Sequence, residues 1–461
     1  MKYSYLLIAS LLFSFSCTMK KEKAADDTAD VKLITLDPGH FHAALVQKTS
    51  YPDVSKDVYV YSPGGADLDE HLKRINGYNT RQDNPAGWNE IIYTGQDFFE
   101  KMIAEKKGNV MVTAGNNGKK TDYIKQTLSG GINVLADKPM AIDVVGFEKL
   151  KECFNIAKEK NVLLYDIMTE RFEITTMLQK EFSRIAAVYG EQQSGSVDDP
   201  GIVKESVHHF FKTVSGNPLI RPAWFFDVNQ QGEGIVDVTT HLVDLVQWAC
   251  FPEQIINYQA DIELLDANRW TTEMSIEQFR EVTGLDNYPS YLAKDIKDNT
   301  LHVYANGNIF YKIRNVHAKV SVIWNYTYPE GGGDTHYSIM KGSKSHLIIE
   351  QGKEQNYKPA LFIKCMEKDA DAFEKTLQTS LSDVAKKFPG VSLKKIEKDK
   401  WEVIVPAEYH NGHEAHFGQV TENFLKYLKQ GSLPAWEVPN MIAKYYVTTH
   451  ALEMAKGKTG K

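Results

Sequence analysis

The stretch Gly130-Gly-Ile-Asn-Val-Leu-Ala-Asp-Lys-Pro139 indicates the fold most clearly. The two glycines end a helical segment, and the apolar residues that follow them form a short buried strand. Asp137 and Lys138 come directly after that strand, and Pro139 fixes the turn that contains them. A buried strand that leads into polar residues is typical of a parallel sheet, whose ligands bind at the carboxyl ends of the strands.

Strands and helices alternate on both sides of this stretch. Repeated β–α units with short connections predict a parallel sheet with helices on both faces, and hence an α/β fold. Strands are expected at Val31–Leu36, Val58–Tyr61, Val110–Thr113, Ile132–Leu135 and Val162–Tyr165, with helices from Ala43 and at Phe98–Lys106, Tyr123–Leu128 and Val144–Phe154.

The second half of the chain has a different pattern. Thr300–Ile313, His317–Tyr328 and His336–Glu350 alternate polar with β-branched or aromatic residues between Gly-bearing turns, which predicts antiparallel strands. Trp270–Gly284 is expected to be a helix that ends at its glycine. Residues 355–405 combine a strand, a helix and a hairpin, and we interpret them as an inserted α/β module.

Composition limits the class of protein. The chain has 461 residues, of which 42% are hydrophobic and 25% charged, as in an ordinary globular protein of about two domains. The net charge of −7 and the lack of a basic stripe give no support for nucleic-acid binding. Beyond the N-terminal segment the cysteines are widely spaced, which predicts neither a disulfide framework nor a zinc site: Cys153, Cys250 and Cys365.

Residues 1–17 are predicted to be a signal segment, because Lys2 precedes the short apolar run Tyr3–Phe15. The segment resembles a bacterial lipoprotein signal in which Cys17 becomes the lipidated first residue, although Ser14 replaces the usual aliphatic residue; plain cleavage is the alternative. Residues 18–30 are predicted to form a tether. We therefore expect export to the periplasm or outer membrane of a Gram-negative bacterium, with membrane contact only through the lipid.

The turn Asp37-Pro-Gly-His-Phe-His42 follows the first strand, where a dinucleotide pyrophosphate would lie. The dinucleotide fingerprint has three glycines, and only the middle one, Gly39, is present. No acidic residue for the adenosine ribose directly follows the second strand, which ends near Ser62. Asp67 and Asp69 are more distant candidates, so NAD and NADP remain open.

The stretch Gly232-Glu-Gly-Ile-Val-Asp-Val-Thr-Thr-His-Leu-Val-Asp244 predicts an amphipathic helix from about Ile235. Asp237, His241 and Asp244 lie on one stripe of that helix, so a carboxylate and an imidazole sit one turn apart. The pair can act as an acid and a base. The alternative is an Asp favoured by the helix dipole and a His that only packs.

These motifs, in this order, resemble those of the Gfo/Idh/MocA oxidoreductases over roughly residues 31–250. The Glu-Lys-Pro motif of that family stands here as Asp137-Lys138-Pro139, and its Asp-x-Gly-x-His-x-x-Asp helix as Asp237 to Asp244, with Thr239 in place of Gly. Its Thr-Pro-Asn segment appears as Ala114-Gly-Asn116, and its Asn-Arg-Arg-Phe-like segment as Thr169-Glu-Arg-Phe172. The degenerate glycine turn is the main departure.

The resemblance implies a Rossmann NAD(P)-binding domain at residues 31–166. It also implies a C-terminal α+β domain at residues 167–461, with an open, mostly antiparallel sheet that serves substrate binding and homo-oligomerisation. The implied cofactor is NAD or NADP, with NAD favoured and tight binding expected. Its expected contacts are Gly39, His40, Phe41, His42, Ser62, Ala114, Asn116, Asp137, Lys138 and Arg171.

The activity implied is oxidation of a hydroxyl on a sugar, glycoside or cyclitol. His241 would be the base, Lys138 would stabilise developing alkoxide charge, and Asp237 would orient His241 or hold Lys138. Redox-neutral cleavage of a glycosidic bond by a bound NAD, or sugar binding without catalysis, are the alternatives. Expected substrate contacts are Arg171, Trp224, His241 and Asp244.

Three histidines near the C-terminus, His410, His413 and His416, suggest a zinc site. Gly412 interrupts the segment, and no cysteine or carboxylate set completes the site. We therefore expect these histidines to line a pocket or the surface, and we expect activity to need no metal.

Overall fold

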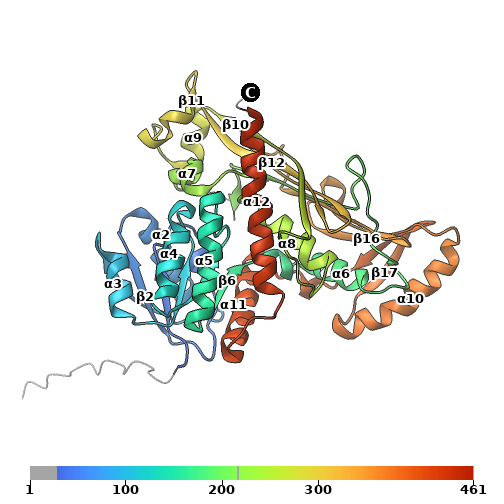
Figure 1. Ribbon diagram of the computed structural model, residues 1–461, viewed down its shortest axis with the longest axis horizontal. Coiled ribbons are helices and arrows are strands. Elements are labelled where there is room, and N and C mark those ends of the chain that lie inside the picture. Colours follow the sequence, from blue (N-terminus) through green and yellow to red (C-terminus); the bar gives the residue numbers. More distant parts are fainter. Residues whose placement is uncertain (1–28, 215–216, 460–461) are drawn as a thin grey trace, which may run out of the picture.

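The structure is a computed structural model that describes residues 29–214 and 217–459, so the predicted signal segment, Cys17 and most of the tether lie outside the described residues. Figure 1 shows two halves, each built on a sheet, on either side of the long C-terminal helix α12 (Glu437–Thr459). Within the described ranges no helix is both long enough and apolar enough to span a bilayer.

The N-terminal half is a doubly wound parallel sheet, as predicted, and its six strands are the five expected ones and β3. Its order β3-β2-β1-β4-β5-β6 reverses between β1 and β4, which is the topological switch point where such folds bind ligands. The strands are β1 (Leu33–Leu36), β2 (Asp57–Ser62), β3 (Asn89–Thr94), β4 (Val110–Thr113), β5 (Asn133–Asp137) and β6 (Leu164–Ile167). The helices are α1 (His42–Val46), α2 (Ala66–Thr80), α3 (Phe98–Glu105), α4 (Asn117–Ser129) and α5 (Val144–Lys160).

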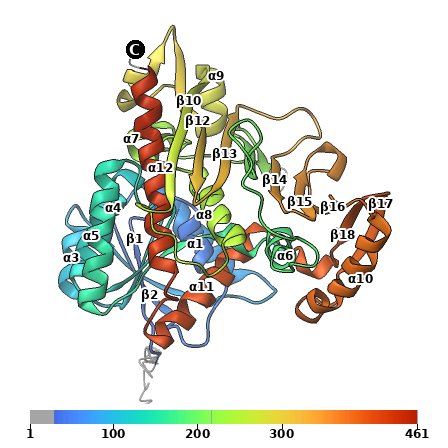
Figure 2. The same cartoon turned by 45° about the vertical axis from the view of Figure 1, so that its right-hand side comes forward.

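The C-terminal half contains a mixed sheet of ten strands, mostly antiparallel, in which β7 and β13 are parallel neighbours. In Figure 2 this sheet extends away from the Rossmann domain toward α10. Its strands are β7 (Ile202–His209), β10 (Ile262–Met274), β11 (Ile296–Lys297), β12 (Thr300–Ile313), β13 (Val316–Asn325), β14 (Thr335–Lys341), β15 (Ser345–Gln351), β16 (Ala360–Cys365), β17 (Ser392–Glu397) and β18 (Lys400–Ile404). The α-helices before α12 are α6 (Ile174–Ser183), α7 (Val228–Gln231), α8 (Thr239–Cys250), α9 (Ile276–Thr283), α10 (Ala370–Lys387) and α11 (His413–Gln430).

Residues 355–405 form the predicted strand, helix and hairpin, and β16, β18 and β17 continue the edge of the ten-stranded sheet with α10 beside them. One sequence expectation needs correction. Trp270 is not helical: β10 runs to Met274, and α9 begins at Ile276, where Ser275 forms a capping box with Gln278. The long pairing of β10 with β12 decides the conformation of Trp270–Met274.

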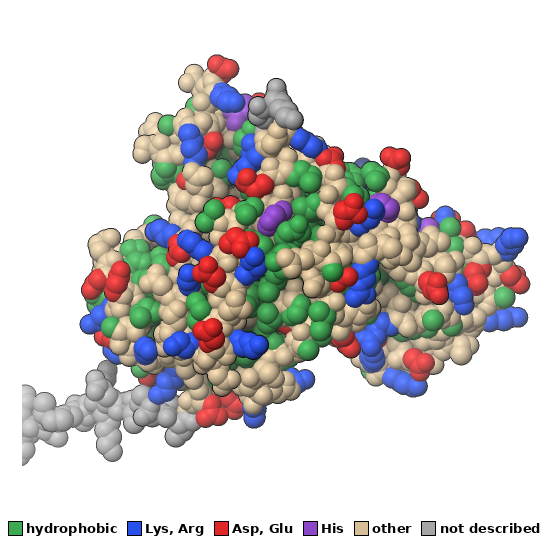
Figure 3. Space-filling view, viewed as in Figure 1, with side chains coloured by type: hydrophobic (Ala, Val, Ile, Leu, Met, Phe, Trp, Pro, Cys, Tyr) green, Lys and Arg blue, Asp and Glu red, His purple; other side chains and the backbone are tan. Residues whose placement is uncertain are grey.

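Helix α12 joins the two halves. Tyr445 packs in the core of the Rossmann domain, whereas Ala443 and Val447 pack in the core of the large sheet. The hydroxyl of Tyr445 also donates to Asp166 (3.1 Å) and accepts from the backbone N–H of Met140 (3.1 Å). Figure 3 shows apolar side chains gathered between the two halves, with acidic and basic side chains interspersed over the rest of that face.

Candidate active site

A cavity of about 990 Å³ lies at the carboxyl ends of the Rossmann strands, between the two halves of the chain. The turn after β1 and the end of β5 line one side, and the start of α8, the β7 and β14 strands and the start of α11 line the rest. Its polar lining includes His40, His42, Asp137, Lys138, Glu170, His208, Asp237, His241, Asp334, His336, His413 and His416.

Lys138 and Asp237 form a buried ion pair in this cavity. The peptide between Lys138 and Pro139 is cis, and Lys138 Nζ lies 2.5 Å from Asp237 Oδ1. The other oxygen of Asp237 accepts from Gln231 Nε2 (3.1 Å). Burial alone would lower the pKa of Lys138, but the nearby Asp237 and Asp137 raise it above its ordinary value. Lys138 is therefore a protonated ammonium group at neutral pH.

His241 lines the same cavity from the first turn of α8. Burial, with the neighbouring Lys138 and His413, lowers the pKa of His241 well below its ordinary value, so the imidazole is neutral. Its Nδ1 has no hydrogen-bond partner among the described residues. A neutral imidazole beside an ammonium group can accept a proton from a hydroxyl whose oxygen the ammonium stabilises.

The predicted helix begins later than the sequence suggested. Helix α8 starts at Thr239, so Asp237 lies in the preceding turn rather than one helical turn before His241. Backbone N–H groups of Thr240 and His241 donate to Asp237 and Val238 and close that turn. Of the two roles predicted for Asp237, the hydrogen bond observed is the one to Lys138.

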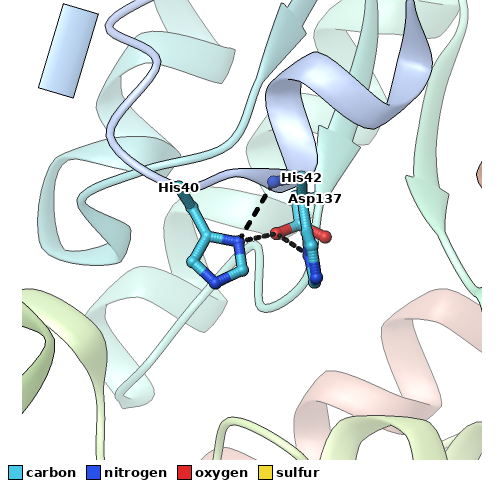
Figure 4. Close-up of side chains that lie close together, drawn as sticks. All are labelled: His40, His42 and Asp137. Carbon is cyan, nitrogen blue, oxygen red and sulfur yellow. Dashed lines mark hydrogen bonds and ion pairs between the residues drawn. The ribbon is translucent and has the colours of Figure 1, made fainter. Parts of the chain in front are cut away.

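The turn after β1 places two histidines against the end of β5. His42 Nδ1 lies 3.0 Å from Asp137 Oδ2, and His40 Nδ1 lies 3.8 Å from the same oxygen (Figure 4). Burial lowers the pKa of both histidines well below the ordinary value. Phe41 lies beside them and also lines the cavity.

Side chains of the protein lie directly against Gly39. A Cβ atom at Gly39 would lie 3.2 Å from Trp224 Cζ2 and 3.2 Å from Asp67 Oδ2. Trp224 Nε1 donates to Asp67 Oδ2 (3.0 Å), so a residue of the C-terminal half covers the turn after β1. Trp224 does not line the cavity, and its predicted contact with a sugar face stays a prediction beside the observed contact with Asp67.

The remaining predicted cofactor contacts lie around that turn but outside the cavity lining. The Ala114 carbonyl accepts from the His40 N–H (3.1 Å), Ser62 Oγ accepts from the Gly64 N–H (3.1 Å), and Asn116 Nδ2 donates to Gln230. The cavity beside Lys138 and His40 fits the nicotinamide end of a dinucleotide. Trp224, hydrogen-bonded to Asp67, lies against the turn after β1, where the rest of a dinucleotide would be expected.

Arg171 and Asp244 form part of a buried ionic network, not of the cavity. Arg171 makes two hydrogen bonds to Asp244 (2.6 and 2.7 Å) and two to Glu437 (2.8 and 3.1 Å). Lys444 bridges Asp244 (2.8 Å) and Asp166 (2.7 Å). Although burial acts in the opposite direction, Arg171 and Lys444 hold the pKa of Asp244 below its ordinary value. The predicted contacts of Arg171 and Asp244 with cofactor and substrate stay predictions; in this structure their polar groups bind each other, Glu437 and Lys444.

The sequence did not assign several residues that line the cavity, notably Glu170, His208 and Asp334. His208 and His209 contact Asp334 at 3.4 and 3.0 Å, which brings the Gly-rich turn 330–334 to the pocket. In the sequence, only that Gly-rich turn and the adjacent histidines of β7 could have indicated these cavity residues. His413 lies 3.5 Å from Glu170, and its ring centroid is 6.3 Å from that of His416.

Comparisons with known proteins identify the family. A family profile described as "Putative oxidoreductase C terminal domain" matches residues 178–456, more than half of the chain. A solved structure described as a "putative oxidoreductase" from Parabacteroides merdae ATCC 43184 is 68% identical, with a TM-score of 0.92 over 93% of this chain and 98% of that one. No match is found among curated proteins.

More distant solved structures share the fold. Levoglucosan dehydrogenase in complex with NADH and levoglucosan is 12% identical, with a TM-score of 0.60 over 93% of this chain and 98% of that one. KijD10, a 3-ketoreductase from Actinomadura kijaniata in complex with NADP, is 13% identical, with a TM-score of 0.55 over 90% and 95%. With its Rossmann domain, its mixed C-terminal sheet and the matching profile, the chain belongs to the oxidoreductases of the Gfo/Idh/MocA type.

Proposed function

We propose that the protein transfers a hydride between a nicotinamide dinucleotide and a hydroxyl-bearing carbon of a sugar, glycoside or cyclitol. The observation that supports this most directly is the placement of protonated Lys138 and neutral His241 in one cavity at the carboxyl edge of the Rossmann sheet. The bound ligands of the two distant neighbours, NADH with levoglucosan and NADP, are of the same classes.

In this proposal one residue accepts the proton and another stabilises the negative charge. The nicotinamide, when bound, accepts the hydride from the carbinol carbon. His241 takes the hydroxyl proton, and Lys138 stabilises the negative charge that develops on the same oxygen. Asp237 keeps Lys138 protonated and holds its ammonium group in place, because the pair is buried and its N–O distance is 2.5 Å.

Redox-neutral cleavage of a glycoside is the second candidate. The cavity volume of about 990 Å³ is at the upper end for small-molecule sites, which leaves room for a group attached to a sugar ring. Oxidation of a ring hydroxyl would acidify the neighbouring C–H, elimination would then break the glycosidic bond, and addition of water and return of the hydride would restore the cofactor.

A panel of free sugars and glycosides, each with NAD, with NADP and with neither, tests the proposal. We expect His241→Ala and Lys138→Met each to lower turnover at least about 100-fold without loss of fold. His317→Ala, a histidine of β13 outside the cavity, is the matched control and should retain activity. Near-normal turnover in both cavity variants would favour the alternative of sugar binding without catalysis.

We further propose that the chain is exported as a lipoprotein anchored through Cys17 and that it acts as a homo-oligomer. Labelling with a radioactive fatty acid should mark the wild-type chain and not Cys17→Ala. Light scattering of the purified protein gives its oligomeric state. Both measurements are independent of the activity assay.

Export to a compartment with little free nucleotide favours a retained cofactor. After gel filtration to remove free nucleotide, a glycoside should still turn over without added NAD. Activity that collapses on desalting and returns in proportion to added NAD would contradict retention.

A further inference from the structure

We propose that His40, His42 and Asp137 bind a divalent transition-metal ion at the wall of the cavity. The three residues come from the turn after β1, the first residue of α1 and the end of β5, and they point toward one another in Figure 4. Within the part of the chain that the structure describes, they are the one group of three such side chains whose ligand atoms all lie within 4.8 Å of one another.

The spacing of the ligand atoms suits a small divalent cation. A tetrahedral ion with bonds of about 2.0–2.1 Å places its ligand atoms about 3.3 Å apart. The distances from Asp137 Oδ2 to His42 Nδ1 and His40 Nδ1, 3.0 and 3.8 Å, lie on either side of that value. Adjustments of a few tenths of an ångström would therefore be enough to coordinate the ion.

Ion binding would rearrange the hydrogen bonds among the three ligands. The backbone N–H of His42 donates to His40 Nδ1 (3.4 Å), and the same nitrogen lies 3.8 Å from Asp137 Oδ2. His42 Nδ1 shares a hydrogen bond with Asp137 Oδ2 at 3.0 Å. To bind a cation, His40 Nδ1 gives up its long hydrogen bond, and the proton of the His42–Asp137 hydrogen bond moves to His42 Nε2 or to solvent.

Neighbouring groups hold the three ligands in place. Lys120 Nζ donates to the backbone carbonyl of Asp137 (2.9 Å) and to Asn117 Oδ1 (2.5 Å). The ring of Phe417 packs against His42, with 4.6 Å between centroids. Groups that orient metal ligands in this way are a regular feature of metal sites.

The charges and the shape of the pocket also favour the ion. Besides Asp137 itself, the carboxylates of Asp237 and Glu170 line the cavity and offset the ammonium group of Lys138. Three protein ligands leave a fourth position open toward the cavity, as in catalytic zinc sites.

This assignment explains the departure from the dinucleotide fingerprint. His42 occupies the position of the third glycine of that fingerprint, and the metal site uses its side chain as a ligand. The ion would lie on the same cavity wall as Lys138 and could polarise the same substrate oxygen. The assignment replaces the sequence-based expectation of a site without metal, and it does not depend on hydride transfer.

The test uses the full-length chain, without an affinity tag, freed of metal by a chelator. Titration with Zn²⁺, followed by calorimetry and elemental analysis, should give one ion per chain. His40→Gln, His42→Gln and Asp137→Asn should each weaken binding at least about 100-fold, more than loss of an outer-shell partner does. His410→Gln and His416→Gln, which alter the other histidine group, should bind like wild type.

Two measurements keep the test decisive if a variant unfolds. Among the described residues the His40 side chain makes one long hydrogen bond, so His40→Gln is expected to fold, and thermal unfolding without metal checks this. Anomalous scattering at the zinc edge from crystals of the wild-type protein locates the ion directly. No saturable binding, unchanged binding in folded His40→Gln, or an ion found elsewhere would overturn the proposal, whereas failure of hydride transfer alone would leave zinc binding intact.

Discussion

Lys138 Nζ and Asp237 Oδ1 lie 2.5 Å apart, although 99 residues separate them in the chain. Lys138 follows the β5 strand of the Rossmann domain, and Asp237 lies in the turn before α8 of the C-terminal half. The ion pair therefore connects the two halves of the chain at the wall of the cavity. Its two partners are both buried, so removal of either one would leave the other as an unpaired buried group.

Asp237→Asn should lower turnover and shift its pH dependence. In the wild type the charge of Asp237 offsets the lowering of the Lys138 pKa by burial. Without that carboxylate the pKa of Lys138 falls, so Lys138 loses its proton at a lower pH than in the wild type. The pH–rate profile should therefore lose activity at its alkaline side earlier. Asp266→Asn, which removes the partner of Lys458 in a surface pair, is the matched control and should leave the profile unchanged. An unchanged profile for Asp237→Asn would show that the ion pair is only structural.

Trp224→Phe should let the dinucleotide bind faster. The variant keeps an aromatic ring but removes the N–H that donates to Asp67, and a hydrogen bond to a charged group contributes about 1.5–3 kcal/mol. If Trp224 must leave Asp67 before the adenosine end binds, association should speed up about tenfold or more. Stopped-flow fluorescence with NAD measures this, with Trp270→Phe on the exposed part of β10 as control. Equal rates would mean that the contact does not limit access.

Asp244→Asn should destabilise the protein and leave substrate affinity unchanged. Removal of one partner from a buried ion pair costs about 3–5 kcal/mol, because the remaining Arg171 and Lys444 lose their counter-charge. The free energy of unfolding in urea measures the loss, and the surface variant Asp266→Asn should change it by less than about 1 kcal/mol. A raised KM with normal stability would instead restore the predicted substrate contact.

His71 should make the protein less stable in mild acid. Neither of its ring nitrogens has a partner among the described residues, and burial, with some help from Arg74, lowers its pKa to about 4. Between about pH 6.5 and pH 4 the unfolded chain binds a proton that the folded chain does not. Stability therefore falls as pH falls through that window, by up to about 1.4 kcal/mol per pH unit.

The measurement compares urea unfolding near pH 7 with unfolding near pH 5. His71→Leu removes this contribution and should lose less stability between the two pH values than the wild type. His317→Leu, at a partly exposed position of β13, should behave like the wild type. Identical pH dependence in all three proteins would rule out His71 as a source of acid sensitivity.

Several elements could be predicted from sequence because their signals are local. The predicted strand after Gly131 became β5, and the apolar spacing from Val144 became α5. The spacing of apolar residues and the glycines between segments follow from the period of the backbone itself. They therefore indicate helices and strands without knowledge of the tertiary contacts. Helix α2 and strand β3 were missed because they are largely polar or exposed and show no such period.

Other assignments depended on partners far away in the chain. Trp270 is in a strand because β12 pairs with it, and the Arg171 guanidinium lies outside the cavity, where it binds Asp244 and Glu437. A motif identifies a residue type at a position, but it does not say whether a charged side chain meets a ligand or another buried charge. Only the packing of α8 and α12 against each other, around Arg171, decides that.

The sequence alone predicted the alternation of strands and helices. It also predicted the edge of the sheet at which Lys138 lies. The parallel strands β1, β4 and β5 then bring His42 to Asp137 across 95 residues, and Asp237 reaches Lys138 from the other half of the chain. Local backbone preferences fix the period of each element. The distances between charged groups arise only when the elements pack, because burial and proximity, not order along the chain, set which charges meet.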